Sequence, residues 1–316
     1  MSTPQVGWIG LGSMGLQMSK NLQRHLNKTN QQCLIYTNRT LSRGASLETL
    51  GAKPVETVAQ VVQASDIVFS CVSDDKALRK IVDAALEFIA GKTFVDCSTV
   101  HPETSVTLAK RVSESQGRYV SAPVFGAATA AAKAELIFVT AGPKAAKEQI
   151  APYLKGVMGR SIIDLGEQQE KANLMKISGN IVVVGFMELI SEAHVFAEKT
   201  GLGCDVLESM IHEMFGAVPL SYSRRITTGA YAPPPGEKAG FDVALAIKDA
   251  RHALNCASGV GVRLDVTEVA LAHMELAQSL EGDGGQRPLD SSSIYGAIRT
   301  QSGLGFYTDA AGGGSS

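Results

Sequence analysis

Apolar and polar positions follow one repeating pattern through the first half of the chain. Short apolar runs, typical of strands buried on both faces, alternate with stretches whose apolar residues recur every three or four positions, typical of helices. The strands predicted in this way are residues 6–9, 33–37, 66–72, 93–96, 118–121, 135–140 and 162–165. The helices predicted between them are residues 14–26, 41–50, 56–64, 76–89 and 103–115. This alternation predicts an α/β fold of Rossmann type, with a doubly wound parallel sheet that takes some antiparallel strands near its end.

The pattern changes after Gly166, where strand signals stop. Residues 170–200 predict one long helix that is apolar on most faces and ends at Gly201. Further helices are predicted at 205–215, 241–258 and 265–281, with a rigid proline-rich loop at 231–236. We therefore expect an N-terminal Rossmann domain at 1–165, a C-terminal all-helical domain at 166–309 and a flexible tail at 310–316. Because so apolar a helix must be covered by other helices or by a second subunit, we also expect a homodimer.

Composition and charge narrow the functional classes. The chain has 316 residues, 45% of them hydrophobic, and a formal net charge of −2, so neither a nucleic-acid-binding surface nor an acidic disordered tail is expected. The most apolar window, 177–190, carries Asn180 and Glu188, so we do not expect a membrane span. The five cysteines are scattered and form no C-x-x-C pair, which favours a reducing compartment, the cytoplasm, and predicts neither a disulfide framework nor a metal site.

The first candidate for chemistry is the glycine-rich turn after the first strand. Gly10, Gly12 and Gly15 have the G-x-G-x-x-G spacing of a dinucleotide-binding turn, and Ser13 and Met14 lie inside it. In such a turn the first glycine permits the bend, the second lets a pyrophosphate approach, and the third lets the helix pack on the strand. An ordinary glycine-rich turn can have the same spacing. The turn at Gly10 to Gly15 follows a predicted strand and lies within a strand-helix-strand order, and this context favours dinucleotide binding. All five residues are predicted cofactor contacts.

The end of the second strand indicates which dinucleotide is preferred. A turn that prefers NAD places a carboxylate there, on the ribose 2′-hydroxyl. This chain instead has Asn38, Arg39 and Thr40, and a guanidinium can bind a 2′-phosphate through two hydrogen bonds. A solvated loop arginine is the alternative. The position of Arg39 at this turn favours NADP as the cofactor.

Two later loops fall at the carboxyl ends of strands, where open parallel sheets bind ligands. Val72 and Ser73 follow one strand, and Ser98 and Thr99 follow the next. We predict cofactor contacts from Val72, Ser73 and Thr99 and a substrate contact from Ser98. Simple helix capping is the alternative for these hydroxyls, and it is the role we predict for Asp74.

The long helix carries the candidate acid–base group. Lys176 and Asn180 are four residues apart and project from one helix face, inside a stretch that is otherwise apolar. Two roles explain a lysine in such a stretch equally well. It could extend its ammonium out to solvent from an apolar surface, or it could face a cleft and transfer a proton. The residues alone leave these two readings open.

Taken together in order, these motifs resemble those of the β-hydroxyacid dehydrogenase family over nearly the whole chain. That family includes 3-hydroxyisobutyrate dehydrogenases, tartronate semialdehyde reductases and glyoxylate/succinic semialdehyde reductases, and 6-phosphogluconate dehydrogenase is a relative. The segments that carry the resemblance are Gly10-Leu-Gly-Ser-Met-Gly15 with Asn21-Leu22, Asp96-Cys-Ser-Thr99, Ala122-Pro-Val-Phe-Gly126 and Lys176-x-x-x-Asn180.

The resemblance implies roles for individual residues. Lys176 would be the general acid/base on the substrate oxygen, Asn180 would orient the substrate, and Lys248 would reach the cofactor from the helical domain. It implies an active site between the two domains and dimers built from long helices. It also separates this chain from imine reductases, which share the architecture but usually lack the lysine. An imine reductase and a catalytically inactive cofactor-binding homologue nevertheless remain the alternatives to an NADP-dependent oxidoreductase acting on a carbonyl or hydroxyl group.

One segment departs from the family pattern. Where the family usually has a serine and two glycines, this chain has Phe125, Gly126 and Ala127. These three residues are predicted substrate contacts. A phenyl ring at this place favours a less polar or bulkier substrate than a small 2-methyl-3-hydroxy acid.

Overall fold

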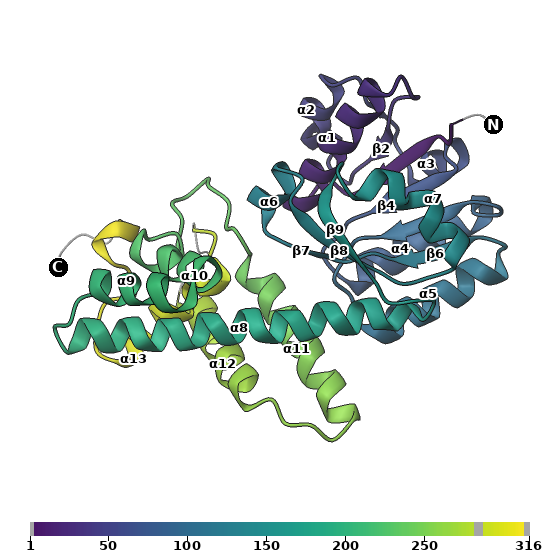
Figure 1. The fold of residues 1–316 in the computed structure, drawn as a ribbon. Coiled ribbons are helices and arrows are strands. Elements are labelled where there is room, and N and C mark those ends of the chain that lie inside the picture. The colour runs from purple at the N-terminus through teal and green to yellow at the C-terminus, as the bar shows by residue number, and fades with distance from the viewer. Residues whose placement is uncertain (1–2, 281–286, 313–316) are drawn as a thin grey trace. The chain divides into compact units, whose positions relative to one another are not determined.

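A parallel sheet forms the centre of the first of two units, Met1–Lys176 and Ile177–Ser316, in a computed structural model that describes residues 3–280 and 287–312. Within the described residues this sheet has six strands in the order β3-β2-β1-β4-β5-β6, all parallel. The strands are β1 (Val6–Ile9), β2 (Ile35–Thr37), β3 (Lys53–Pro54), β4 (Ile67–Ser70), β5 (Thr93–Asp96) and β6 (Arg118–Ser121). This order confirms the predicted doubly wound Rossmann sheet (Figure 1).

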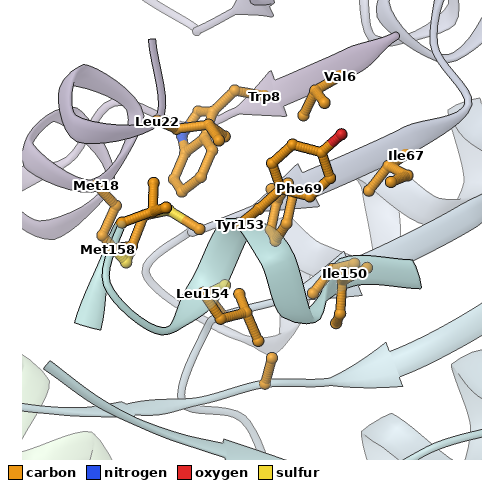
Figure 2. Packing of buried hydrophobic residues seen from close by; sticks show 14 of the residues in the cluster. Val6, Trp8, Met18, Leu22, Ile67, Phe69, Ile150, Tyr153, Leu154 and Met158 are labelled. Atoms are coloured by element: carbon orange, nitrogen blue, oxygen red, sulfur yellow. The ribbon is translucent and has the colours of Figure 1, made fainter. Parts of the chain in front are cut away.

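Helices cover both faces of the sheet because successive residues of each strand point to opposite sides. They are α1 (Ser13–Lys28), α2 (Ala45–Glu48), α3 (Val58–Ala64), α4 (Asp75–Ala85), α5 (Pro102–Glu114), α6 (Ala128–Ala132) and α7 (Lys144–Leu154), with short 3₁₀ segments η1 (Leu41–Gly44) and η2 (Leu86–Phe88). On one face Trp8 and Phe69 stack at 5.6 Å and pack against α1 and α7 (Figure 2). On the other, Val68 and Phe94 pack against α3, α4 and α5.

Local capping explains where some helices begin. The predicted helix at 56–64 begins at Val58 because Thr57 caps it: the Thr57 hydroxyl accepts a hydrogen bond from Gln60 N at 3.2 Å, and Gln60 Oε1 accepts one from Thr57 N. Asp74 caps α4 as predicted, with Oδ1 2.8 Å from Ala77 N. The predicted helix at 41–50 is two short pieces, η1 and α2.

The antiparallel pairing predicted near the end of the parallel sheet is present, but it belongs to a separate second sheet and not to the parallel one. In the described part of the first unit, three further strands form a second sheet in the order β7 (Val124–Phe125), β8 (Leu136–Thr140) and β9 (Gly159–Asp164), with β7 antiparallel to β8 and β8 parallel to β9. The two sheets meet through an isolated bridge between Ser121 and Ala141. Pro123, which has no amide hydrogen to donate, separates β6 from β7. Four elements of this unit, β3, β7, α6 and α7, were not predicted; α7 contains Pro152, which weakens its helical signal.

The second unit is helical, as predicted. It contains most of α8 (Gln169–Lys199), then α9 (Cys204–Phe215), α10 (Ala217–Thr227), α11 (Val243–Gly259), α12 (Asp265–Leu280), η3 (Ser291–Ser293), α13 (Ile294–Gln301) and η4 (Asp309–Ala311). Tyr231 and Tyr295 meet edge to face at 5.3 Å in its core. Neither α10 nor α13 was predicted. The predicted flexible tail begins too early, since Ala311 is buried and its carbonyl accepts a hydrogen bond from Arg287; residues 313–316 lie outside the described part of the chain.

The length and composition of α8 would let it cross a membrane, and it is the one helix among the described residues for which this holds. A core helix of a soluble protein passes the same test, so this finding alone assigns no membrane. Part of α8 is core, with Val184 and Met187 packed among the other helices of the second unit. Val182, Leu189 and Phe196, seven residues apart, are instead exposed.

Candidate cofactor-binding and active-site residues

The carboxyl ends of the parallel strands lie in register. On β1, Ile9 pairs with Thr37 of β2 on one side and with Ser70 of β4 on the other. Ser70 pairs with Asp96 of β5, and Asp96 pairs with Ser121 of β6. The chain leaves β1 toward β2 and later returns to β4 on its other side, so the strand order reverses at β1. This reversal is where open α/β sheets bind ligands.

The three fingerprint glycines have three different surroundings. Gly10 has φ +96°, and a Cβ on it would lie 2.3 Å from Cys71 O. A Cβ on Gly15 would lie 2.3 Å from Gly10 O, so the helix packs on the turn only because Gly15 has no side chain. A Cβ on Gly12 would meet no described atom within 4 Å. The first and third glycines are therefore required for folding, whereas Gly12 leaves open space beside the backbone.

The start of α1 faces that open space. The helix begins at Ser13 after Gly12, and its described first turn has neither a capping side chain nor an acidic residue. Uncapped first-turn amides carry partial positive charge and bind phosphate groups. Gly12 and Ser13 are exposed and Met14 is half-buried, so these residues fit the pyrophosphate of a dinucleotide.

Asn38 joins the glycine-rich turn to the loop after β2. Its Oδ1 accepts a hydrogen bond from Leu11 N at 2.9 Å, and its Nδ2 donates one to Thr40 O at 2.8 Å. Both ends of the Asn38 amide are thus used to hold the two loops together. Arg39 and Thr40 are exposed beside it.

A buried carboxylate organises the loops after β4 and β5. Asp96 is fully buried, and its Oδ1 accepts hydrogen bonds from Ser70 Oγ at 2.9 Å and Ser98 Oγ at 2.7 Å. Burial raises the pKa of Asp96 to about 6, although the hydrogen bonds from Ser98, Ser70 and Tyr119 oppose the rise. Sequence reasoning used Asp96 only as part of a motif; its place at the end of a buried strand was the signal that could have identified this role.

Ser98 connects these two loops through its hydroxyl. While Oγ donates to Asp96, it accepts a hydrogen bond from Val72 N at 2.9 Å. Ser98 is also buried, so it could meet a substrate only by giving up one of these bonds. Val72 and Thr99 are half-buried, and Ser73 is exposed with its hydroxyl donated to Asp74 Oδ2 at 2.6 Å.

Lys176 and Phe125 lie together in the first unit. The Lys176 Nζ atom is 4.7 Å from the centroid of the Phe125 ring, within the range of a cation–π interaction. Both side chains are half-buried. Gly126, which follows, has φ +127° and is exposed, and Ala127 is half-buried at the start of α6. The substitution that departs from the family pattern therefore contacts the proposed acid–base residue directly.

In the second unit the buried carboxylate of Asp249 joins Asn180 and Lys248, two residues that the sequence predicted as part of the site. Asn180 Nδ2 donates to Asp249 Oδ2 at 2.7 Å, and Lys248 Nζ lies 2.9 Å from Asp249 Oδ1. Asp249 is 4% exposed and Asn180 5% exposed. Sequence reasoning missed Asp249, although a carboxylate next to a lysine in the middle of an apolar helix was a usable signal.

The residues that the structure describes contain no group of three His, Cys, Asp or Glu side chains that could hold a metal ion. Cys33, Cys71, Cys97 and Cys204 carry free thiols. Burial raises the pKa of the Cys71 thiol to about 12, so the thiol next to the glycine-rich turn is neutral.

Family profiles cover nearly all of the chain. Residues 5–166 match the NAD binding domain of 6-phosphogluconate dehydrogenase. Residues 171–298 match the NAD-binding domain of NADP-dependent 3-hydroxyisobutyrate dehydrogenase.

Two similar curated proteins are oxidoreductases matched over nearly their whole length. An NADH-dependent oxidoreductase of Aspergillus ustus is 30% identical, over 93% of this chain and 99% of its own. Glyoxylate/succinic semialdehyde reductase 1 of Arabidopsis thaliana is 31% identical, over 93% of this chain and 98% of its own.

Solved structures share the fold. The 3-hydroxyisobutyrate dehydrogenase of Mycobacterium tuberculosis has a TM-score of 0.76 at 23% identity and covers 95% of this chain and 100% of its own. An imine reductase of Streptomyces aurantiacus has a TM-score of 0.62 at 23% identity and covers 94% of this chain and 99% of its own. At these identities the structural likeness shows the architecture alone.

Proposed function

Because the chain belongs to the β-hydroxyacid dehydrogenase family, and so is an NAD(P)-dependent oxidoreductase acting on CH–OH groups, we propose that it interconverts a carbonyl and a hydroxyl group with NADP(H) and with Lys176 as general acid/base. The observation that carries this proposal is the placement of the family's lysine. Lys176 is half-buried in the unit that also contains the dinucleotide turn, with its ammonium over an aromatic ring. This environment argues for an ordered role and against a lysine that merely extends to solvent.

Residues at the carboxyl edge of the sheet would hold the cofactor. The amides of Ser13 and Met14 beside the open Gly12 suit its pyrophosphate, and Val72, Ser73 and Thr99 lie on the adjoining loops. Lys248 joins them on the strength of the family resemblance. When bound, the nicotinamide supplies or accepts the hydride.

NADP is proposed over NAD because of the loop after β2. No carboxylate occupies positions 38–40, and the exposed guanidinium of Arg39 can pair with a 2′-phosphate. Because one of the relatives is named as NADH-dependent, similarity to relatives does not decide between NADP and NAD. The proposal of NADP therefore rests on Arg39.

During reduction Lys176 would give its proton to the substrate's carbonyl oxygen as the carbonyl carbon accepts hydride, and water would then reprotonate the amine. General acid catalysis of this kind contributes roughly 10²- to 10⁴-fold in rate. Asn180 would orient the substrate, and the hydrogen bond from Asn180 to Asp249 would fix the direction of its amide. During oxidation the neutral amine of Lys176 would remove the hydroxyl proton.

A less polar or bulkier carbonyl compound is the substrate class that the loop at Phe125 favours. A serine at that position would offer a hydroxyl to a carboxylate, whereas the phenyl ring offers apolar surface. Ala127 adds a methyl group where the family usually has glycine. A small substrate with a carboxylate would be buried there with its charge poorly paired, which costs binding free energy.

An NADPH-oxidation screen against aldehydes, keto acids and cyclic imines tests this proposal. We expect turnover of aldehydes or ketones. Turnover of cyclic imines alone would identify an imine reductase, the alternative that the shared architecture of a solved imine reductase raises. Tight NADPH binding without turnover of any compound would indicate an inactive homologue.

A homodimer is proposed from the exposed apolar residues of the second unit. Val182, Leu189 and Phe196 follow one face of α8, and Val206 and Met210 on α9 are also exposed. Exposed apolar patches of this kind mark interaction surfaces. Light scattering should give the mass of two chains at micromolar concentration, and the mass of one chain would contradict the proposal.

A further inference from the structure

The Phe125 ring is fixed from several sides within the first unit. It extends from β7, where Phe125 pairs with Ile137 of β8, and it packs against a small cluster that contains Val139 and Ala172. The next residue, Gly126, has φ +127°, and a Cβ there would lie 2.6 Å from Leu136 Cδ2. This backbone conformation favours glycine, so a residue with a side chain would be strained directly after the ring.

The same cluster connects the ring to the helix that carries Lys176. Ala172 lies on α8 one turn before Lys176, so the helix is packed against the ring's surroundings. Lys176 Nζ then lies 4.7 Å from the ring centroid. The negative face of a phenyl ring attracts an ammonium group but not a neutral amine.

We infer that Phe125 is a positioning residue for Lys176: its ring holds the ammonium group in place and favours the protonated form of the amine. This role rests on the proposed function of Lys176 as the proton donor. A serine, the usual residue of the family at this place, has no ring face to offer.

The ring would affect reduction and oxidation in opposite ways. Reduction requires protonated Lys176 and slows as pH rises past the point where the amine loses its proton. A ring that favours the ammonium moves this loss to higher pH, so reduction proceeds over a wider pH range. Oxidation requires the neutral amine and is confined to correspondingly higher pH.

Other charged groups also lie on the elements around Phe125 and Lys176. The titratable side chains carried by these elements and their flanks include Lys133 and Glu135 before β8, Asp164 at the end of β9, and Glu170 and Lys171 on α8. Lys133, Glu135 and Lys171 are exposed, and Asp164 is paired with Lys147. All of them stay the same when only position 125 is changed, so a change at that position isolates the ring.

The experiment measures the pH dependence of kcat/KM for carbonyl reduction in variants at position 125. Phe125→Leu keeps apolar bulk and removes the ring, and Phe125→Tyr keeps the ring. In Phe125→Leu, the pH at which kcat/KM declines on the alkaline side should move down by about half a unit to one and a half units. In Phe125→Tyr it should stay the same. Unchanged limbs in both variants would overturn the inference, whatever happens to the absolute rate.

A second series covers the case in which Phe125→Leu does not fold. Mono-, di- and trifluorinated phenylalanines at position 125 keep the shape of the ring and progressively weaken its negative face. The limb should move to lower pH stepwise with each fluorine. A limb that does not respond to fluorination contradicts the inference.

Failure of the inference and failure of the proposed function are separable. Lysines labelled by ¹³C-methylation are titrated by NMR, and the signal missing from Lys176→Met identifies Lys176. If Lys176→Met keeps the wild-type rate and pH profile, the proposed catalytic role fails. The NMR titration still shows whether the Phe125 ring changes the pKa of the Lys176 amine.

Discussion

Replacing Gly12 by alanine should separate cofactor binding from folding. Gly12 has φ −67° and ψ −172°, an extended conformation that any residue adopts, and the added methyl would meet no described atom within 4 Å. Fewer unfolded conformations would stabilise the variant by about 0.4–1 kcal/mol, and the poorer helix cap would offset roughly 0.5–1 kcal/mol of this. We therefore expect the melting temperature to change by no more than about 4 °C.

Cofactor affinity should respond much more strongly. The methyl would occupy the space that a pyrophosphate needs to reach the first amides of α1. Losing one such charge-assisted hydrogen bond costs about 1.5–3 kcal/mol, so Kd for NADP⁺ should rise about ten- to a hundredfold. Isothermal titration calorimetry of the cofactor-free protein measures Kd, and thermal denaturation measures stability in the same preparation.

Gly15→Ala is the matched control for this prediction. Its Cβ would lie 2.3 Å from Gly10 O, so the backbone must shift, and overpacking of this kind costs about 1–3 kcal/mol. It should lose stability without cofactor present, whereas Gly12→Ala should not. Wild-type affinity in Gly12→Ala would refute the assignment of this turn as the pyrophosphate site.

Three further predictions concern cofactor choice, pH and substrate. Arg39→Ala should raise KM for NADPH about ten- to a hundredfold and leave KM for NADH nearly unchanged; equal losses for both cofactors would contradict the NADP assignment. Burial raises the pKa of Asp96 from its ordinary value of 3.8 to about 6, so the folded state binds the Asp96 proton more tightly than the unfolded state does. Protonation of Asp96 therefore stabilises the fold. This contribution is complete below about pH 4 and is lost as pH rises through 6. Relative to Asp96→Asn, wild type should therefore lose about 2.4 kcal/mol of unfolding free energy between pH 4 and 7, and parallel curves from urea denaturation would contradict this. Phe125→Ser should shift the preference in kcat/KM from an apolar aldehyde toward succinic semialdehyde. If the wild type already prefers succinic semialdehyde and the variant shows no shift, the idea that Phe125 makes the substrate pocket less polar is excluded.

Much of the fold could be predicted because its signals are local. Short apolar runs and helical periodicity identified every described strand of the parallel sheet except β3, and also the long helix α8, and the glycine spacing identified the turn after β1. The separate sheet β7-β8-β9 could not be predicted because strand pairing is decided by contacts between distant segments. Short elements such as β3, β7 and α6 carry too few residues to show a period.

The candidate site divides in the same way. Motif residues could be named from the sequence, but their hydrogen-bond partners could not. The contact between Lys176 and Phe125 joins residues far apart in the chain, as does the hydrogen bond from Asn180 to Asp249. The bond from Ser98 to Asp96 is local, but its importance depends on the burial of Asp96, which the sheet provides.

The kinetics of Lys176→Ala decide whether Lys176 is the proton donor. In carbonyl reduction with NADPH, kcat should fall by roughly two or more decades, while Kd for NADPH and the melting temperature stay close to wild type. Lys171→Ala, which removes an exposed lysine on the same helix, is the control and should keep the wild-type rate. A Lys176→Ala variant that keeps its rate, or loses stability in proportion to its activity, would contradict the role of Lys176 as the proton donor.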